Sequence, residues 1–235
     1  MKRFKKRIMK RFKTIVFIII FLYNIYLINI KSKGLRNMEI TIRNAKKILT
    51  KYLQGKNQKK FEHSIRVART SKMIAEKCNV SVEDSIIAGL LHDIGKGLSR
   101  WQILELANRN NIDIYDFELF ETHEALHGKI SALLFEEEFD NTEIERFKNI
   151  SHAISYHVAG GEDKMTPLDK ILYIADNAEP EKNIEFYQQL NNEDTIDMNK
   201  WVKKIIKDKQ SRAVQKQRIQ NPLIDATLEN LDDER

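Results

Sequence analysis

The sequence of 235 residues predicts an all-α fold, a single helical bundle that follows a short N-terminal segment. Glycine and proline are scarce, with eight and three residues, and no turn dipeptide typical of β-hairpins separates alternating strands. Apolar residues instead recur at intervals of three and four, the period of an α-helix with one buried face. A chain of this length can form one domain with a substantial core.

Helices can be assigned in order along the chain. Ser81 and Ser99 are expected to be N-caps, Pro167 to open a helix and Pro180 to end it. The expected helical segments are 38–54, 58–78, 82–92, 100–106, 123–139, 142–157 and 167–176, followed by two charged helices at 184–210 and 211–232. The prediction is therefore a segment at 1–37 and one helical domain at 38–235.

The distribution of charge argues against a nucleic-acid-binding protein. The net charge is +6, but residues 1–37 hold eleven Lys or Arg and no acidic residue. The remaining residues carry 29 basic and 34 acidic side chains, so the domain itself is mildly acidic. It has no basic stripe to follow a phosphate backbone, and we expect no nucleic-acid partner.

The N-terminal segment combines eight basic residues in 1–13 with an uncharged run of seventeen residues at 14–30. A bilayer-spanning helix needs about 20 apolar residues, with a lower limit of about 17. No small-residue cleavage site follows, which argues against a removed signal peptide. Three interpretations remain open: a short signal anchor, an interfacial anchor, or an extension upstream of a natural start at Met38.

The single cysteine, Cys78, excludes an internal disulfide and fits a reducing compartment. The positive-inside rule would instead place the domain outside the cell if the segment spanned the membrane. We therefore expect a cytoplasmic domain, with membrane contact through residues 14–30 as the alternative. We consider a homodimer as the assembly state.

All six histidines fall between His63 and His157, each in or beside apolar, helix-like sequence. Acidic residues accompany them, as in the adjacent pair His92 and Asp93. Imidazole and carboxylate ligands together suit iron, manganese or zinc, whereas carboxylates alone would favour magnesium or calcium. The sequence therefore predicts a site for a divalent transition metal.

Four residues are the candidate metal ligands. His92 and Asp93 end an apolar helix, and a buried carboxylate needs a partner such as a metal. Asp176 ends a second helix, which is so apolar that a carboxylate is unexpected there unless it has a function. His63 also lies among apolar residues. The alternatives are a hydrogen-bonded Asp–His pair and a core histidine. Two imidazoles and two carboxylates would leave positions open for water and substrate. Asp169 is interpreted instead as a structural charge at a helix N-terminus.

Other polar residues are candidates for contact with the substrate. His127, before Gly128, and His157, beside a glycine pair, are assigned to the site, because a glycine there suggests close packing or ligand approach. His123 and His152 are expected to lie outside it. Lys96, three residues after Asp93, can offset charge on a bound phosphate. Lys60 is a weaker candidate for the same role.

In this order the motifs resemble those of the HD-domain metal-dependent phosphohydrolases, and within them the bacterial YqeK family of symmetrical bis(5′-nucleosyl)-tetraphosphatases. The matching pieces are Glu62-His63-Ser64, Leu91 to Lys96, Leu126-His127-Gly128 with Ala132, Tyr156-His157 with Gly160, Met165 to Asp176, and Glu179-Pro180. The resemblance implies an all-helical HD domain, usually iron-bound, that cleaves diadenosine tetraphosphate into two ADP. Where the family tends to have Asn-Arg, this chain has Glu181 and Lys182, and a lysine cannot reproduce the bidentate fork of arginine.

The residues predict metal-dependent hydrolysis of a phosphoanhydride, with iron, manganese or zinc as the cofactor. The resemblance narrows this to symmetrical hydrolysis of diadenosine tetraphosphate, with iron favoured. Asp93 and Lys96 are assigned to catalysis. The assigned metal ligands are His63, His92, Asp93 and Asp176, and the substrate contacts are Lys60, His92, Asp93, Lys96, His127, His157 and Glu181. The alternatives are another HD-type nucleotide phosphohydrolase or phosphodiesterase, or a membrane-tethered nucleotide sensor that binds without turnover.

Overall fold

The computed structural model describes residues 38–115, 118, 125–158, 160, 164–215 and 223–232. The chain divides into two units between Asn37 and Met38, and the first unit lies outside the described residues. The run expected to contact a membrane, 14–30, and His123 also lie outside them. Among the described helices, none is long and apolar enough to cross a bilayer.

The predicted all-α fold is confirmed: the described residues form ten α-helices and one 3-10 helix and no strand longer than an isolated bridge. The helices are α2 (Ile42–Leu53), α3 (Gln58–Cys78), α4 (Val82–Leu91), η1 (Ile94–Gly97), α5 (Arg100–Arg109), α8 (His127–Glu138), α9 (Ile144–Tyr156), α10 (Pro167–Ala178), α11 (Ile184–Asn192), α12 (Met198–Gln215) and α13 (Leu223–Asp232).

The first helix is shorter than expected, because the residues before it pair with a distant part of the chain. Met38 forms a parallel bridge with Phe139. Its N–H donates to the carbonyl of Glu138 (2.9 Å), and its carbonyl accepts from the N–H of Asp140 (3.0 Å). α2 therefore starts only at Ile42, after Thr41 has capped it through the N–H of Asn44. This bridge ties the start of the domain to the end of α8.

Side-chain caps set most of the helix starts that the sequence predicted. Ser99 forms a complete capping box with Gln102, and the Ser81 hydroxyl accepts from the N–H of Asp84. Thr166 and Asp169 form a second capping box at the start of α10. Asp169 also accepts from His152, at 3.0 Å, so its interpretation as a structural carboxylate is confirmed.

The predicted pair of C-terminal helices is wrong, because this region contains three helices. Lys77 on α3 donates to the carbonyls of Leu190, Asn191 and Glu193, which end α11. Asp197 then accepts from the N–H of Lys200 and starts α12, so the break falls at 193–197. α12 continues to Gln215, past the expected end at residue 210.

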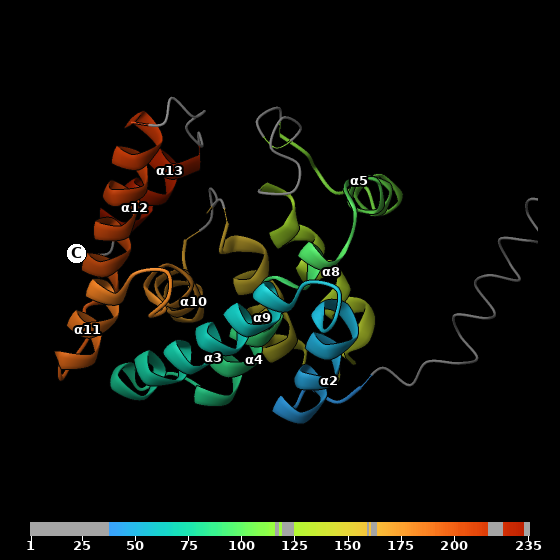
Figure 1. Ribbon diagram of the computed structural model, residues 1–235, viewed down its shortest axis with the longest axis horizontal. Coiled ribbons are helices and arrows are strands. Elements are labelled where there is room, and N and C mark those ends of the chain that lie inside the picture. The colour runs from blue at the N-terminus through green and yellow to red at the C-terminus, as the bar shows by residue number, and fades with distance from the viewer. Residues whose placement is uncertain are drawn as a thin grey trace, which may run out of the picture. The chain divides into compact units, whose positions relative to one another are not determined.

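The bundle is built around α3, α4, α9 and α10, with α2 and α5 on one side and α11 to α13 on the other (Figure 1). Gly89 permits the close approach of α3 and α4, since a β-carbon there would lie 2.7 Å from the Cα of Ala68. Gly128 does the same between α8 and α9, where a β-carbon would lie 2.9 Å from the carbonyl oxygen of Ser155. The close packing suggested for Gly128 is confirmed. These contacts place the predicted ligands near one another.

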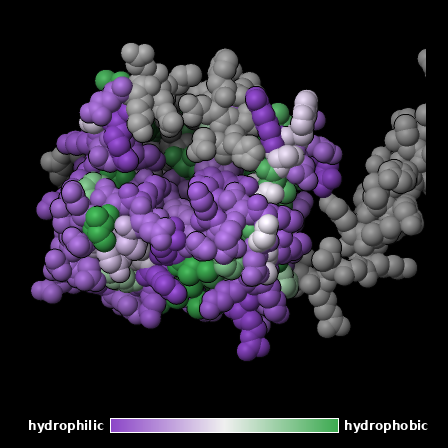
Figure 2. All heavy atoms as spheres, in the orientation of Figure 1, coloured by the Kyte–Doolittle hydropathy of each residue, from purple (hydrophilic) through white to green (hydrophobic). Residues whose placement is uncertain are grey.

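The face seen in Figure 2 is mostly hydrophilic, with apolar residues in small separate patches. Most large apolar side chains instead lie in one buried core that runs through the bundle. Cys78 packs against that core, and burial raises the pKa of its thiol, as expected for an inert cysteine.

Candidate metal centre

Six of the predicted site residues converge in the interior of the bundle, although five helices supply them. His63 comes from the first half of α3, His92 and Asp93 from the junction of α4 with η1, and Asp176 from the last turn of α10. His127 is the first residue of α8, and His157 follows the last residue of α9. His92, Asp93, His127 and His157 are almost fully buried. The arrangement therefore depends on the packing of the whole domain.

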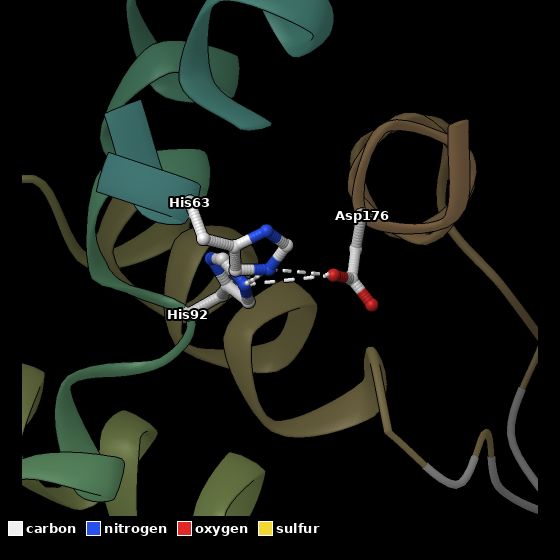
Figure 3. Close-up of side chains that lie close together, drawn as sticks. All are labelled: His63, His92 and Asp176. Atoms are coloured by element: carbon white, nitrogen blue, oxygen red, sulfur yellow. Dashed lines mark hydrogen bonds and ion pairs between the residues drawn. The ribbon is translucent and has the colours of Figure 1, made fainter. Parts of the chain in front are cut away.

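His63, His92 and Asp176 form the first of two ligand groups (Figure 3). Nε2 of His63 lies 3.0 Å from Oδ1 of Asp176 and 3.3 Å from Nε2 of His92. Nε2 of His92 lies 3.8 Å from the same carboxylate oxygen. Three potential donor atoms thus face one another across a small space.

His92, Asp93 and His157 form the second ligand group, with His127 beside it. Oδ1 of Asp93 lies 3.6 Å from Nε2 of His92, 3.8 Å from that of His157 and 3.1 Å from that of His127. Its other oxygen lies 3.8 Å from Nε2 of His63. The Asp93 carboxylate therefore stands between the two groups.

The hydrogen bond made by Nδ1 of each ring determines that Nε2 is the nitrogen that can bind an ion. Nδ1 of His92 lies 2.8 Å from the carbonyl of Gly89, and Nδ1 of His157 lies 2.6 Å from the carbonyl of Ile154. A carbonyl can only accept, so these Nδ1 atoms carry hydrogens and, in a neutral ring, Nε2 presents a lone pair. Nδ1 of His63 lies 3.2 Å from the Glu179 carboxylate, which has the same effect.

Protonation states in the centre suit a cation. Burial lowers the pKa of His92 to about 3 and that of His127 to about 4, so both rings are neutral at neutral pH. Burial opposes ionisation of Asp93 and Asp176, but their polar neighbours hold the pKa of each carboxyl well below its usual range. Lys182 is the largest such influence on Asp176, and His92 on Asp93. Neutral imidazoles beside ionised carboxylates are the forms that bind metals.

This donor set fits a divalent transition metal. Without a cation, the Nε2 lone pairs of His63 and His92 would face each other and the Asp176 carboxylate, which is electrostatically unfavourable. Donor separations of 3.0 to 3.8 Å match the edges of a coordination sphere with bonds of about 2.1 Å. The observed residues thus supply both the ligand types and the spacing that such an ion requires.

Three lysines surround the two carboxylates. Nζ of Lys96 lies 2.9 and 3.0 Å from the two oxygens of Asp93, and Nζ of Lys60 lies 4.0 Å from one of them. Nζ of Lys182 lies 3.0 Å from both oxygens of Asp176. Lys182 was not among the predicted site residues, although it stands where the resembling family tends to have arginine. Positive charge thus borders both ligand groups.

Glu179 and Arg66 belong to the centre, and the sequence reasoning missed both. The buried Glu179 carboxylate contacts His63 on one oxygen and accepts from Nε of Arg66 on the other, at 2.8 Å. Arg66 also reaches Glu181 at 2.9 Å. The Glu181 side chain is 70% exposed, so this predicted substrate contact lies on the outer side of the Arg66–Glu179 pair. In the sequence, the signal that could have indicated Glu179 was its position three residues after Asp176.

The remaining histidine predictions agree with this geometry as far as the structure describes them. His152 is part-exposed, pairs with Asp169, and stacks on Tyr156 at 5.0 Å between ring centroids. It is thus engaged outside the metal centre, as expected.

Comparison with known proteins places this centre in a family. The model of the HD domain matches residues 61–181, which include the six converging histidines and aspartates. The chain therefore belongs to the HD domain family. This membership agrees with the resemblance in its motifs.

Two curated relatives match this chain at modest identity. The symmetrical bis(5′-nucleosyl)-tetraphosphatase of Staphylococcus aureus is 30% identical over 54% of this chain and 62% of its own length. That of Bacillus subtilis is 23% identical over 66% of this chain and 80% of its own length. The chain thus spans less than two thirds of the Staphylococcus relative.

A solved structure shares the fold. It is a predicted HD superfamily hydrolase involved in NAD metabolism from Clostridium acetobutylicum, with a TM-score of 0.67 and 23% identity. The likeness covers 81% of this chain and 96% of that one. It extends the shared architecture to helices beyond residues 61–181.

Proposed function

We propose that the protein hydrolyses dinucleoside tetraphosphates symmetrically and converts diadenosine tetraphosphate into two ADP. The observation that carries the proposal is the arrangement around Asp93, whose carboxylate stands between two groups of imidazole nitrogens and is flanked by Lys96. Two relatives named as symmetrical bis(5′-nucleosyl)-tetraphosphatases support the choice of substrate. Iron is the proposed cofactor, with manganese or zinc as alternatives.

In this proposal His63, His92, Asp93 and Asp176 hold the ion. A divalent ion there supplies a Lewis acid and makes water a better nucleophile at neutral pH. Lys96 turns from Asp93 toward a phosphate oxygen, where its charge offsets that of the transition state, and Lys60 assists from 4.0 Å away. Glu181, which is exposed, contacts the substrate only at the edge of the site.

The bond changes are those of one hydrolysis. Water attacks one of the two inner phosphorus atoms, the bond from that atom to the central bridging oxygen breaks, and ADP leaves. The oxygen of water remains on the other ADP with one of its protons, and the second proton is released. His127 and His157 bind phosphate oxygens on the leaving half. Because the Nδ1 hydrogen of His157 is committed to Ile154, this ring donates to a phosphate only when it carries a second proton.

A second ion is the specific alternative for these histidines. His92, Asp93 and His157 already lie close enough to share one. Under the one-ion proposal, His127→Ala and His157→Ala retain one metal per chain but lose most turnover. Under the alternative, the wild type holds two metals and His157→Ala holds one. Elemental analysis of the purified proteins separates the two.

Product identification tests the proposed reaction. Purified protein is loaded with iron, manganese or zinc and given diadenosine tetraphosphate, a cyclic dinucleotide and nucleoside monophosphates. Two ADP as the products of the first substrate support the proposal. Formation of ATP and AMP, or preferential cleavage of a diester or monoester, would show a different HD-type phosphohydrolase. Tight nucleotide binding without turnover would favour the sensor.

A further inference from the structure

Lys209 lies on the inward face of α12. The preceding positions on this face, Val202, Ile205 and Ile206, are buried in the core. Lys209 follows Ile205 by four residues and Ile206 by three, so it continues the same apolar stripe. A lysine at such a position is costly unless it has a partner.

The stripe brings Lys209 to the vicinity of the metal centre. Its Nζ lies 4.9 Å from the centroid of the Tyr173 ring, and Tyr173 precedes Asp176 by three residues on α10. Lys209 lines a small cavity of about 60 Å³ with Tyr173, Val158, Gly160 and Thr227. Val158 directly follows His157. The cavity is thus bordered by Val158, next to His157 of the second ligand group, and by Tyr173, three residues before Asp176 of the first.

Among the described residues, Lys209 has no direct anionic contact. Within the part of the chain that the structure describes, its ammonium makes no ion pair or hydrogen bond, and the ring of Tyr173 is its polar contact. Burial lowers the pKa of Lys209, which the attraction of Asp176 only partly opposes. A part-buried cation near the candidate metal centre, whose direct contact among the described residues is an aromatic ring, is suited to receive an anion.

We propose that Lys209 binds a phosphate of the substrate. This inference rests on the proposed function for the identity of the anion, a nucleoside di- or polyphosphate. Lys60 and Lys96 flank Asp93. Lys182 contacts Asp176, and Lys209 reaches from α12 to Tyr173, which precedes Asp176 by three residues on α10. A bound tetraphosphate would then contact lysines near both Asp93 and Asp176. Such contacts would hold both nucleoside diphosphate halves of the substrate. Lys209 also lies beyond the 61–181 match, so membership of the family does not assign this contact.

The test compares Lys209→Met with Lys209→Arg and with Lys207→Met as the matched control. Lys207 lies on the same helix but is exposed. Binding of ADP to the metal-loaded proteins is measured by calorimetry, and metal content and melting temperature are measured on the same samples. We expect Lys209→Met to weaken ADP binding by about 10-fold or more, with Lys209→Arg intermediate and Lys207→Met unchanged. Metal content and folding should be retained, since the methionine fits the apolar stripe.

Turnover of diadenosine tetraphosphate adds an independent readout. Lys209→Met should raise KM by a similar factor, because the contact holds substrate. ADP binding unchanged by Lys209→Met, or absent from the wild type, would overturn the inference. If the wild type fails to cleave diadenosine tetraphosphate but its ADP affinity still depends on Lys209, the proposed function fails and the Lys209 site stands.

Discussion

The orientation of single imidazole rings governs the metal centre at the scale of residues. Glu179 is the side chain that orients His63, and Arg66 holds Glu179 in place from the opposite side. Such carboxylate partners fix the tautomer of a ligand histidine and raise its basicity. The geometry of the centre thus depends on residues that would not themselves bind the ion.

We predict that Glu179→Ala lowers metal affinity about 10- to 100-fold, because His63 loses the acceptor for its Nδ1 hydrogen. Glu179→Gln should lose less, since the amide oxygen can still accept. Chelator competition measures both, and Glu185→Ala, at an exposed position on α11, is the control. Equal affinity in Glu179→Ala and the wild type would contradict this role.

Replacement of the two buried aspartates Asp93 and Asp169 should have opposite effects on metal content. Asp93→Ala is expected to abolish stoichiometric metal and activity, because Asp93 stands between both ligand groups. Asp169→Ala should keep the metal but destabilise the fold by about 1 kcal/mol, since it removes half of the capping box of α10. Elemental analysis and thermal melts distinguish these outcomes. Full metal content in Asp93→Ala would refute its assignment as a ligand.

Much of the centre could be predicted at this scale, because a buried histidine or aspartate in an apolar helix is visible in the sequence. Glu179 was harder to predict, since its role depends on His63, 116 residues away in the chain. Lys182 was missed for a different reason: it lies only six residues after Asp176, but beyond the end of α10, so helix spacing did not indicate their contact. A polar residue that stands in an apolar helical segment was predictable from the sequence. A residue whose role depends on a contact outside its own helix was not.

At the scale of helices, close packing of α8 against α9 brings His127 and His157 together. Their Nε2 atoms lie 3.1 Å apart, and Gly128 makes the approach feasible. Helix starts with local caps, such as Ser81 and Ser99, were predictable from sequence. The break before α12 was not, because Lys77 from α3 stabilises the end of α11.

We predict that Gly128→Ala reduces turnover and destabilises the fold by about 1–3 kcal/mol. Its β-carbon would lie 2.8 Å from Val158 and 2.9 Å from the carbonyl oxygen of Ser155, so the two helices must separate. Glu137→Ala, on the exposed face of α8, serves as the control. Chemical denaturation and steady-state kinetics measure the effects. A fully stable and active Gly128→Ala protein would mean that the helices tolerate the shift.

At the scale of the whole molecule, the described helical domain starts with Met38. The recurrence of apolar residues at intervals of three and four and the scarcity of glycine were sufficient to predict the all-α class. Capping residues were sufficient to predict many of the helix boundaries. The bridge between Met38 and Phe139 was not predictable, because it joins two segments about 100 residues apart that carry no strand pattern.

We predict that a protein lacking residues 1–37 is soluble and fully active, since every member of the metal centre lies downstream. Removing residues 1–41 instead should lower stability, because the hydrogen bonds of Met38 with Glu138 and Asp140 and the Thr41 cap are lost. Thermal melts and activity assays compare both with the full chain. Loss of turnover on removal of residues 1–37 alone would show that this segment contributes to the enzyme.

The position of the ligands along the chain has a further consequence. His63 and Asp176 are separated by 113 residues, so an ion bound between them would act as a reversible cross-link across most of the domain. Because the unfolded chain offers no such preformed site, each tenfold rise in free metal above the dissociation constant would add about 1.4 kcal/mol to the free energy of unfolding. Metal starvation would then do more than stop turnover. It would also enlarge the unfolded population exposed to proteases, so that the cellular amount of the protein would follow metal supply.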